Sequence, residues 1–330
     1  MREENKMKKA LISGLFSLVL TAALTVPAFA EELIVGGQAV GIQISTDGVI
    51  VAGLNEVETA EGMVSPAEDA GVKTGDLIVS IDGKEVYDAA GVLEAIENAA
   101  DDSVNLQILR GEKNLELELS PAESCEGKKM LGLWLRDGMS GIGTITYYEP
   151  DSGIYGALGH SISDSEAKKE LPVRDGNISQ ANIVSVKPGV AGKPGELNGA
   201  ADLSRVLGSI DKNTQLGIFG RLYSALDGQL METGTMSAGP ATIISTINGN
   251  ERREYSVEIN RVYREAGGTY AMLTVTDAEL LAKTGGIVQG MSGSPIIQNG
   301  KLVGAVTHVF VNDPTRGYGI FIENMLDAAG

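Results

Sequence analysis

Residues 290–295 read Gly-Met-Ser-Gly-Ser-Pro and lead directly into the apolar pair Ile296-Ile297. The glycine two positions before Ser292 leaves the N–H group of Gly290 uncovered by a side chain, and the glycine after Ser292 lets the chain turn back. A serine on such a tight, exposed turn can attack a carbonyl carbon while the N–H groups of Gly290 and Ser292 hold the oxyanion. The stretch therefore predicts a nucleophile turn that opens a β-strand.

A serine nucleophile needs a base, and the chain holds only two histidines, His160 and His308. His160 follows residues 155–159, where a strand pattern changes to a loop, and it precedes Ser292 in the order found in chymotrypsin. We predict His160 as the general base and expect His308 to be structural or part of the substrate wall. The residues alone do not choose the acid that orients the imidazole. The candidates are Asp164, Asp175, Asp202, Asp211, Asp227 and Asp277.

The serine turn resembles the Gly-Asp-Ser-Gly-Gly-Pro turn of chymotrypsin-like peptidases, which aligns Ser292 rather than Ser294 with their nucleophile. Residues 123–330 also hold many short strand patterns, separated by glycine and Asn-Gly turns. The 43 glycines and the aromatic content of only 5% favour a turn-rich β protein over a helical bundle. We predict a mainly β chain in which residues 123–330 form a chymotrypsin-like double β-barrel serine peptidase domain.

The front of the chain alternates short strand patterns, helices and tight turns. Ser65 is placed to cap a helix that begins with proline, and a glycine follows that helix. The run 65–86, above all residues 70–78 (Ala-Gly-Val-Lys-Thr-Gly-Asp-Leu-Ile), resembles a PDZ domain of the bacterial protease type. We therefore assign residues 31–122 to an α+β PDZ domain that precedes the peptidase domain.

The PDZ resemblance implies a groove that binds a peptide ligand. Glycines let backbone N–H groups converge on the carboxylate of a peptide, and the strand pattern 41–45 can accept an added peptide strand opposite a helix. The predicted peptide-binding residues are Gly36, Gly37, Gly41, Ile42, Val92 and Ile96.

Composition excludes several classes of partner and cofactor. The 330 residues are 43% hydrophobic, which is enough for packed cores in two domains. A net charge of -18 repels phosphate backbones and anionic lipid head groups, so we expect neither nucleic-acid nor peripheral membrane binding. With two distant histidines and a single cysteine, the sequence shows no metal-ligand cluster and allows no internal disulfide. We expect no metal or cofactor.

The N-terminus has the pattern of an export signal. Lys6, Lys8 and Lys9 precede an apolar run over residues 10–26, and residues 27–30 read Pro-Ala-Phe-Ala. A basic head, an apolar middle and small residues before the cleavage site are the features of a signal peptide. We expect residues 1–30 to be removed after export, with an uncleaved membrane anchor as the alternative.

Across essentially its whole length the chain resembles the stage IV sporulation protein B peptidases of spore-forming Firmicutes. The resemblance is carried by residues 155–164, 285–289 and 304–320, together with the leader and the PDZ pattern. It implies a catalytic triad of His160, Asp277 and Ser292. It also implies action between the two membranes around the forespore. There such peptidases cleave themselves and a membrane-bound regulator, so that pro-sigma-K processing can begin.

Two other functions stay open. A PDZ adaptor with an inactive peptidase domain would need a damaged site, and intact Ser292 and His160 argue against it. A quality-control protease of the HtrA kind would carry its PDZ domain after the peptidase domain, whereas the pattern here comes first. Family members often have a longer segment before the PDZ domain that contains self-cleavage sites. Only residues 31–33 are available here, so self-cleavage near the front is left open.

Overall fold

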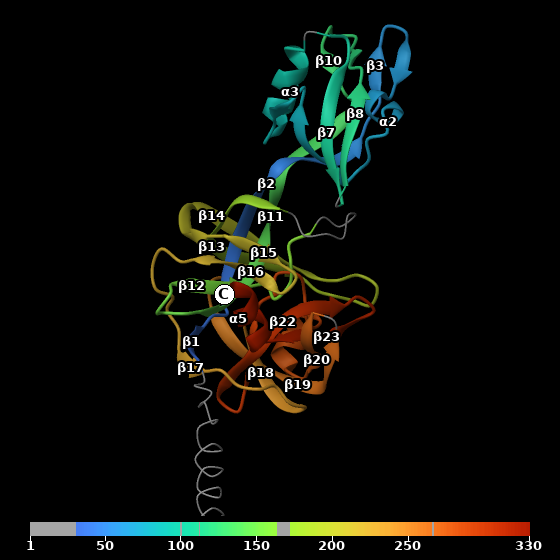
Figure 1. Cartoon of the computed structure of the whole chain (residues 1–330). Coiled ribbons are helices and arrows are strands. Elements are labelled where there is room, and N and C mark those ends of the chain that lie inside the picture. The colour runs from blue at the N-terminus through green and yellow to red at the C-terminus, as the bar shows by residue number, and fades with distance from the viewer. Residues whose placement is uncertain (1–30, 100, 112, 164–171, 266) are drawn as a thin grey trace, which may run out of the picture. The chain divides into compact units, whose positions relative to one another are not determined.

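The structure is a computed structural model, which describes residues 31–99, 101–111, 113–163, 172–265 and 267–330. The predicted signal peptide lies outside these residues. Among them, no helix combines the length and apolar character needed to cross a membrane. The described chain is mainly β (Figure 1), as predicted.

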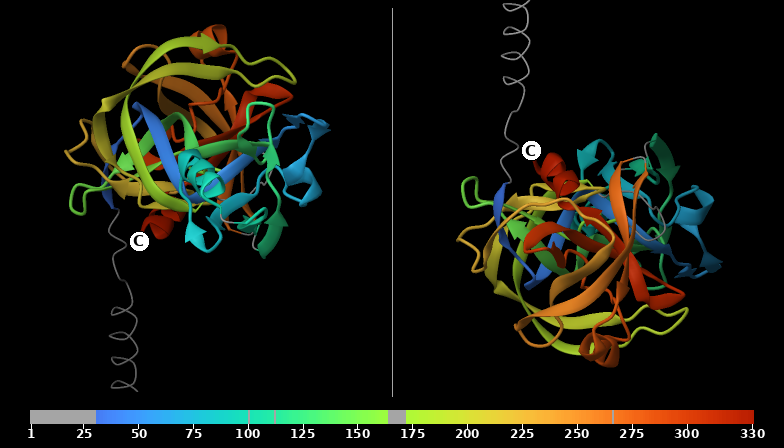
Figure 2. Two further views of the ribbon diagram at one scale, coloured as in Figure 1. Left: turned by 90° about the horizontal axis from the view of Figure 1, so that it is seen from above. Right: turned by 90° about the horizontal axis from the view of Figure 1, so that it is seen from below.

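The C-terminal part of the chain forms a closed, antiparallel, six-stranded barrel with the strand order β18-β19-β20-β23-β22-β21. Its strands, orange to red, lie together in both views of Figure 2. Alternate residues along β20, such as Leu273 and Val275, are buried, which is the period-2 pattern of a strand with one face on a core. The elements are β18 (Gly239–Thr246), β19 (Arg252–Glu265), β20 (Gly268–Val275), α4 (Ala278–Thr284), β21 (Pro295–Gln298), β22 (Lys301–Phe310), β23 (Asp313–Phe321) and α5 (Ile322–Ala329).

The other half of the peptidase fold is built on the sheet around β2 and β11. In it β2 pairs with β11 on one side and with β13 on the other, and β12 and β16 extend it beyond β11. The two ends of this sheet meet, because β14 is followed directly by β15, which pairs with β16, and Gly208 forms a bridge with Leu222. Its strands are β1 (Glu32–Val35), β2 (Ala39–Leu54), β11 (Leu133–Tyr148), β12 (Ile154–Ala157), β13 (Val173–Lys187), β14 (Glu196–Ser209), β15 (Lys212–Thr214), β16 (Gly217–Arg221) and β17 (Leu230–Glu232).

The PDZ-like domain holds the remaining elements around its own core, which includes Val49, Ile78, Val92 and Leu106. They are β3 (Val57–Thr59), β4 (Gly62–Val64), α2 (Pro66–Asp69), β5 (Leu77–Ile81), β6 (Lys84–Glu85), α3 (Ala89–Glu97), β7 (Val104–Arg110), β8 (Lys113–Leu119), β9 (Ala122–Glu123) and β10 (Lys129–Met130).

A buried ion pair ties the loop after α2 to β7. The Asp76 carboxylate is 1% exposed and accepts two hydrogen bonds of 2.7 Å from the guanidinium of Arg110. Arg110 also donates to the carbonyl oxygen of Gly71 at 2.7 Å, and Asp76 accepts from the N–H group of Lys73 at 2.8 Å. Arg110 is 30% exposed, so it is removal of Arg110 that would be costly, because it would leave the buried carboxylate of Asp76 without its counter-charge. The residues 70–78 that suggested a PDZ domain therefore form a loop that is tied to β7 by side-chain contacts.

The domain boundaries differ from the predicted division at residues 31 and 122. Ile34 pairs with Tyr148, and Gly41 pairs with both Ile142 and Ser179, so β1 and the first half of β2 belong to the peptidase sheet. The chain enters the PDZ-like domain within β2 and leaves it within β11. The PDZ-like domain is thus an insertion into the peptidase fold. The period-2 pattern of β2 shows a strand but does not show its partners, which is why the sequence placed this strand in the wrong domain.

Candidate active site

Ser292 lies on the turn between α4 and β21. The flanking glycines adopt left-handed backbone angles, with φ of 97° at Gly290 and 93° at Gly293, which residues with a side chain rarely adopt. Met291 is fully buried, and the buried Ser294 hydroxyl donates to the hydroxyl of Ser245 at 3.0 Å. The residues on either side of Ser292 thus anchor the turn in the barrel.

Strand β11 of the other half of the fold holds this turn from the opposite side. The N–H group of Thr144 donates to the carbonyl oxygen of Ser292 at 3.0 Å. The hydroxyl group of Thr144 donates to the carbonyl oxygen of Gly290 at 2.9 Å. The Thr146 hydroxyl donates to the carbonyl oxygen of Gly293 at 2.8 Å. A Cβ atom on Gly293 would lie 2.0 Å from the carbonyl oxygen of Thr144, so only glycine fits there. Sequence reasoning missed both threonines, because alternating threonines are ordinary in a strand.

Two backbone N–H groups beside the serine are uncommitted. The N–H groups of Gln289, Met291, Gly293 and Ser294 each donate to a carbonyl oxygen. Those of Gly290 and Ser292 have no hydrogen-bond partner among the residues that the structure describes. A developing oxyanion needs such preorganised donors, because each contributes several kcal/mol of transition-state stabilisation, about 3–4 by mutation in a serine protease. The two N–H groups predicted to form the oxyanion hole are therefore the two that are free to do so.

His160 follows β12, and left-handed backbone angles at Leu158 (φ 68°) and Gly159 (φ 70°) turn the chain toward the serine. Its Nδ1 atom lies 2.8 Å from the carbonyl oxygen of Ser161. A carbonyl oxygen only accepts, so Nδ1 carries the proton and Nε2 is left as the proton acceptor. The main chain of Ser161 therefore fixes the tautomer that a general base requires.

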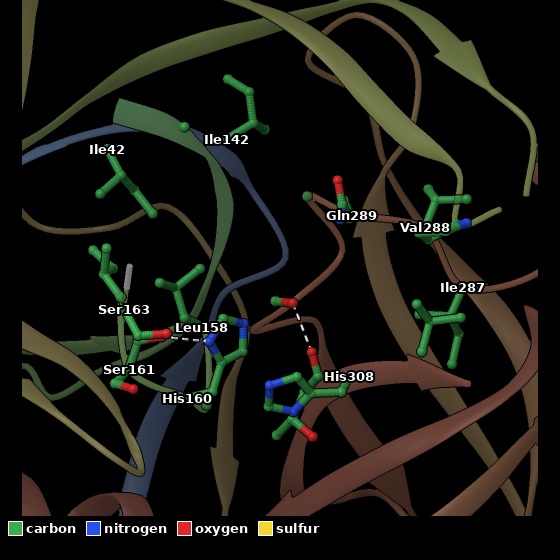
Figure 3. A pocket seen from close by; sticks show the side chains of 18 of the residues that line it. Ile42, Ile142, Leu158, His160, Ser161, Ser163, Ile287, Val288, Gln289 and His308 are labelled. Carbon is green, nitrogen blue, oxygen red and sulfur yellow. Dashed lines mark hydrogen bonds between the residues drawn. The ribbon is translucent and has the colours of Figure 1, made fainter. Parts of the chain in front are cut away.

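The ring of the second histidine lies against that of the first in a tilted arrangement. The ring centroids of His160 and His308 are 4.5 Å apart and the rings are tilted by 36°. Figure 3 shows the two side chains next to each other in the cleft. Desolvation lowers the pKa of His160, against the opposing effect of the Ser161 hydrogen bond. Desolvation, and to a smaller extent the nearby His160, also lowers the pKa of His308. An unperturbed histidine has a pKa of about 6.5. Because the pKa of each ring is lowered from this value, both rings are neutral at pH 7 and His160 can accept a proton.

His160, His308 and Ser292 line one cleft of about 800 Å³. The hydroxyl of Ser292 donates to the carbonyl oxygen of Thr307 at 2.6 Å, the contact drawn as a dashed line near His308 in Figure 3. Attack would require this hydroxyl to rotate toward His160. Such a change is ordinary, because catalytic hydrogen bonds often tighten only when substrate is present.

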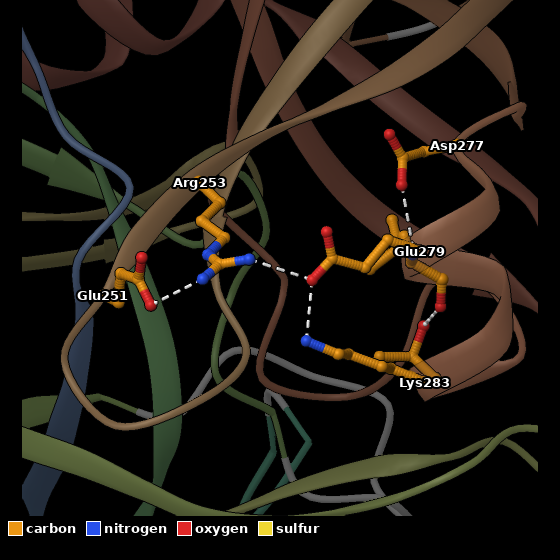
Figure 4. Close-up of polar contacts among 7 residues, drawn as sticks. Glu251, Arg253, Asp277, Glu279 and Lys283 are labelled. Carbon is orange, nitrogen blue, oxygen red and sulfur yellow. Dashed lines mark hydrogen bonds and ion pairs between the residues drawn. The ribbon is translucent and has the colours of Figure 1, made fainter.

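Asp277, the predicted third member of the triad, is placed elsewhere. It is the N-cap residue of α4, where one carboxylate oxygen accepts from the N–H group of Leu280 at 2.9 Å and the other from that of Ser256 at 3.3 Å. Figure 4 shows it at the start of this helix, on the side that carries Glu279 and Lys283. Asp277 does not line the cleft, and the structure does not bring it to His160. The sequence pattern of an aspartate between a strand and a short helix is also that of an N-cap.

No other carboxylate takes its place among the described residues. None of the described residues that line the cleft is an aspartate or a glutamate. The other candidates for the orienting acid among the described residues, Asp175, Asp202, Asp211 and Asp227, therefore do not line the cleft. Asp164 lies outside the described residues. In the described part of the site, the group that orients the imidazole is the carbonyl oxygen of Ser161.

Replacing Asp277 by asparagine distinguishes its role as the N-cap of α4 from the predicted role of orienting His160. Asparagine caps helices about as well as aspartate, so Asp277→Asn should leave the helix in place. We expect kcat/KM of the variant to stay within about threefold of the wild-type value in a peptide cleavage assay, because the carboxylate does not contact His160. A triad aspartate would behave differently, since its conversion to asparagine lowers kcat by about 10⁴-fold in a serine protease. A loss of that size would restore Asp277 as the orienting acid.

Comparison with known families identifies the family of the chain. The family model SpoIVB peptidase S55 matches residues 127–326, more than half of the chain and including both His160 and Ser292. The chain belongs to this family. A PDZ domain model matches residues 61–110. The chain is thus a serine peptidase of the SpoIVB peptidase S55 family with a PDZ domain, as its resemblance to these peptidases indicated.

Other similarities are short or distant. The serine protease HTRA1 of Xenopus laevis is 39% identical over 59 residues, which are 18% of this chain and 12% of that protein. The putative serine protease HhoA of Synechocystis is 37% identical over 60 residues, 18% of this chain and 15% of that protein. The chain therefore matches only a small part of the length of these relatives.

Among solved structures, the active form of the Rv3671c protease from M. tuberculosis is similar over 58% of this chain and 75% of that chain, with 14% identity and a TM-score of 0.35. The thermostable serine protease AL20 from an extremophilic microorganism is similar over 58% of this chain and 91% of that chain, with 10% identity and a TM-score of 0.36.

The predicted peptide-binding residues of the PDZ domain do not lie together. Gly36, Gly37, Gly41 and Ile42 stand in or beside the peptidase sheet; strand partners flank β2 on both sides from Gly41 to Ser45, and Ile42 lines the catalytic cleft. A Cβ atom on Gly36 would lie 2.1 Å from the carbonyl oxygen of Ile145. Close packing against β11 therefore explains why residue 36 is a glycine. Only Val92 and Ile96 are in the PDZ domain, where α3 buries both in the core.

A different segment has the features that a peptide groove needs. The N–H groups of Leu131 and Gly132 have no partner among the described residues, and Gly132 has a φ of 73°. The strand that follows, from Leu133 to Leu135, pairs with β2 on one edge, while α3 contacts β11 as well. A free strand edge beside a helix, with uncommitted N–H groups at its start, can accept a peptide C-terminus. The residues Leu-Gly-Leu at 131–133 are the sequence signal for this loop.

No metal site accompanies the catalytic residues in the described ranges. There, no group of three or more histidine, cysteine, aspartate or glutamate side chains is placed to hold a metal ion.

Proposed function

We propose that this peptidase is exported across the cytoplasmic membrane and acts in sporulation signalling, in the space between the two membranes around the forespore. It cleaves itself and a membrane-bound regulator, so that pro-sigma-K processing can start. The observation that carries the proposal is the site itself. In a chain of the SpoIVB peptidase S55 family, Ser292 lies beside two uncommitted N–H groups and shares a cleft with a neutral His160.

Two further features support this role. The lysines and the apolar run over residues 10–26 have the composition of an export signal. The PDZ domain offers a free strand edge, which suits capture of a protein partner or of the chain's own terminus. An adaptor without activity would have no need of an ordered oxyanion site. A quality-control protease would degrade unfolded casein to small fragments, whereas a signalling peptidase should cut few bonds.

Self-cleavage is tested with a mixture of two forms of the full chain. Purified wild-type protein should give discrete N-terminal fragments by intact-mass measurement, and Ser292→Ala protein alone should remain uncut. Adding a trace of wild type should cut the Ser292→Ala chains at the same bonds. Fragments that arise from Ser292→Ala protein alone, or a wild-type chain that stays intact, would contradict self-cleavage.

The role in sporulation is tested in the host cell. Disruption of the gene should lower the count of heat-resistant spores, and wild-type protein should restore it while Ser292→Ala protein should not. Full restoration by the Ser292→Ala protein would show that proteolysis is not what sporulation requires.

A further inference from the structure

The position of the scissile carbonyl follows from the oxyanion site. Its oxygen must lie between the N–H groups of Gly290 and Ser292, and its carbon must lie next to the Ser292 hydroxyl. The side chain on the acyl side of the bond branches from the adjacent Cα atom. On the cleft side of the oxyanion site, the segments available to it include residues 287–289 before the serine and residues 307–309 on β22, which line the cleft.

The backbone of β22 is open at this point. Its pairing with β21 ends at Ala305, and its register with β23 jumps from Val306 to Val309. Thr307 and His308 therefore lie outside both ladders, and the carbonyl oxygen of Thr307 already accepts from Ser292. An extended substrate can pair with this free stretch, as added strands do elsewhere, and this fixes the direction in which its side chains point.

The wall beside this stretch is apolar. Ile287 and Val288 are 2% and 1% exposed and belong to the barrel core, and the partly buried Val309 packs against the same core. Figure 3 shows Ile287 and Val288 on the side of the cleft across from Ile42. Among the described residues, none that lines the cleft is a lysine, an arginine, an aspartate or a glutamate. Among the described residues that line the cleft, a charged substrate side chain would therefore find no opposite charge.

We propose that the peptidase cleaves after an uncharged, apolar residue whose side chain is held by Ile287, Val288 and Val309. The inference rests on Ser292 being the nucleophile of the proposed function, and it adds the substrate class. A charged side chain in this pocket loses its hydration without gaining a counter-charge, which is costly. We expect a preference of at least about 100-fold in kcat/KM for leucine over lysine or aspartate at this position.

A panel of otherwise identical fluorogenic peptides measures this preference directly. The residue before the scissile bond is leucine, valine, phenylalanine, glutamine, lysine or aspartate, and mass spectrometry confirms the bond that is cut. Parallel labelling with a fluorophosphonate shows whether Ser292 is reactive. Reactive enzyme that cleaves the apolar peptides fastest supports the inference. Reactive enzyme with no preference, or with a preference for a charged residue, overturns it and leaves the peptidase activity standing.

A charge introduced at Val309 tests which residues form the pocket. In Val309→Asp the ratio of kcat/KM for the lysine peptide to that for the leucine peptide should rise by at least about 100-fold, because a carboxylate in such a pocket selects basic residues. Val309→Lys should raise the ratio of kcat/KM for the aspartate peptide to that for the leucine peptide.

The matched control is Val184→Asp, a change at a 67% exposed valine on β13 that does not line the cleft, which should leave all ratios unchanged. Fluorophosphonate labelling of each variant shows that the site is intact. Labelled Val309 variants with unchanged ratios overturn the assignment of the pocket. Failure of the wild type both to label and to cleave would overturn the inference together with the peptidase activity.

Discussion

Ser292→Ala is expected to lower kcat by about 10⁶-fold, because members of a serine catalytic unit act together and loss of the nucleophile removes the covalent step. What remains should be the contribution of the oxyanion site and of substrate binding alone. The substitution removes one oxygen atom, and the backbone contacts of residue 292 with Thr144 do not depend on it. The measurement is the rate of peptide cleavage, with the thermal unfolding midpoint as a check on folding.

The chain offers a matched control two residues further on. Ser294 lies in the same turn but is fully buried, and its hydroxyl bonds to Ser245 rather than facing the cleft. Ser294→Ala should cost about 1 kcal/mol of stability, the typical value of one hydrogen bond, and should keep most of the activity. If Ser294→Ala lost activity and Ser292→Ala retained it, the assignment of the nucleophile would have to be reversed.

His160→Ala is expected to be nearly as damaging as Ser292→Ala, because the serine hydroxyl is a weak nucleophile until a base removes its proton. The double variant should be little worse than either single one, since the two residues form one functional unit. The other histidine of the chain serves as the control. His308 contacts the ring of His160 but is not positioned by a carbonyl hydrogen bond among the described residues. His308→Ala should therefore cost no more than about tenfold in kcat/KM.

Equal losses in the two histidine variants would contradict this division of roles. A loss of activity in His308→Ala alone would make His308 the base. In either case the account of Ser161 as the group that orients the base would have to be abandoned.

Ser292 and His160, which the structure places in one cleft, could be picked out from the sequence because their signals are local. A tight glycine-flanked turn around Ser292 can be read directly from residues 290–295, and only two histidines compete for the role of base. Within the described ranges, the N–H groups of Gln289, Met291, Gly293 and Ser294 donate to carbonyl oxygens, whereas those of Gly290 and Ser292, the two predicted oxyanion donors, have no partner.

The orienting group and the domain insertion could not be predicted in the same way. The carbonyl oxygen of Ser161 is a main-chain atom, which every residue possesses, so no residue type marks its role. Asp277 matched the expected residue type and order, but an N-cap requires the same residue type at the same place. The 16-residue strands β2 and β11 each serve two domains, and a strand pattern does not reveal where its partners change.

The central claim is that Ser292 is activated by His160 within the cleft. The most direct test is to label the full chain with a fluorophosphonate and locate the adduct by peptide mass spectrometry. One adduct per chain on Ser292, absent from Ser292→Ala and strongly slowed in His160→Ala, is the predicted result. An adduct on another residue, or equal labelling of the wild type and His160→Ala, would contradict the account.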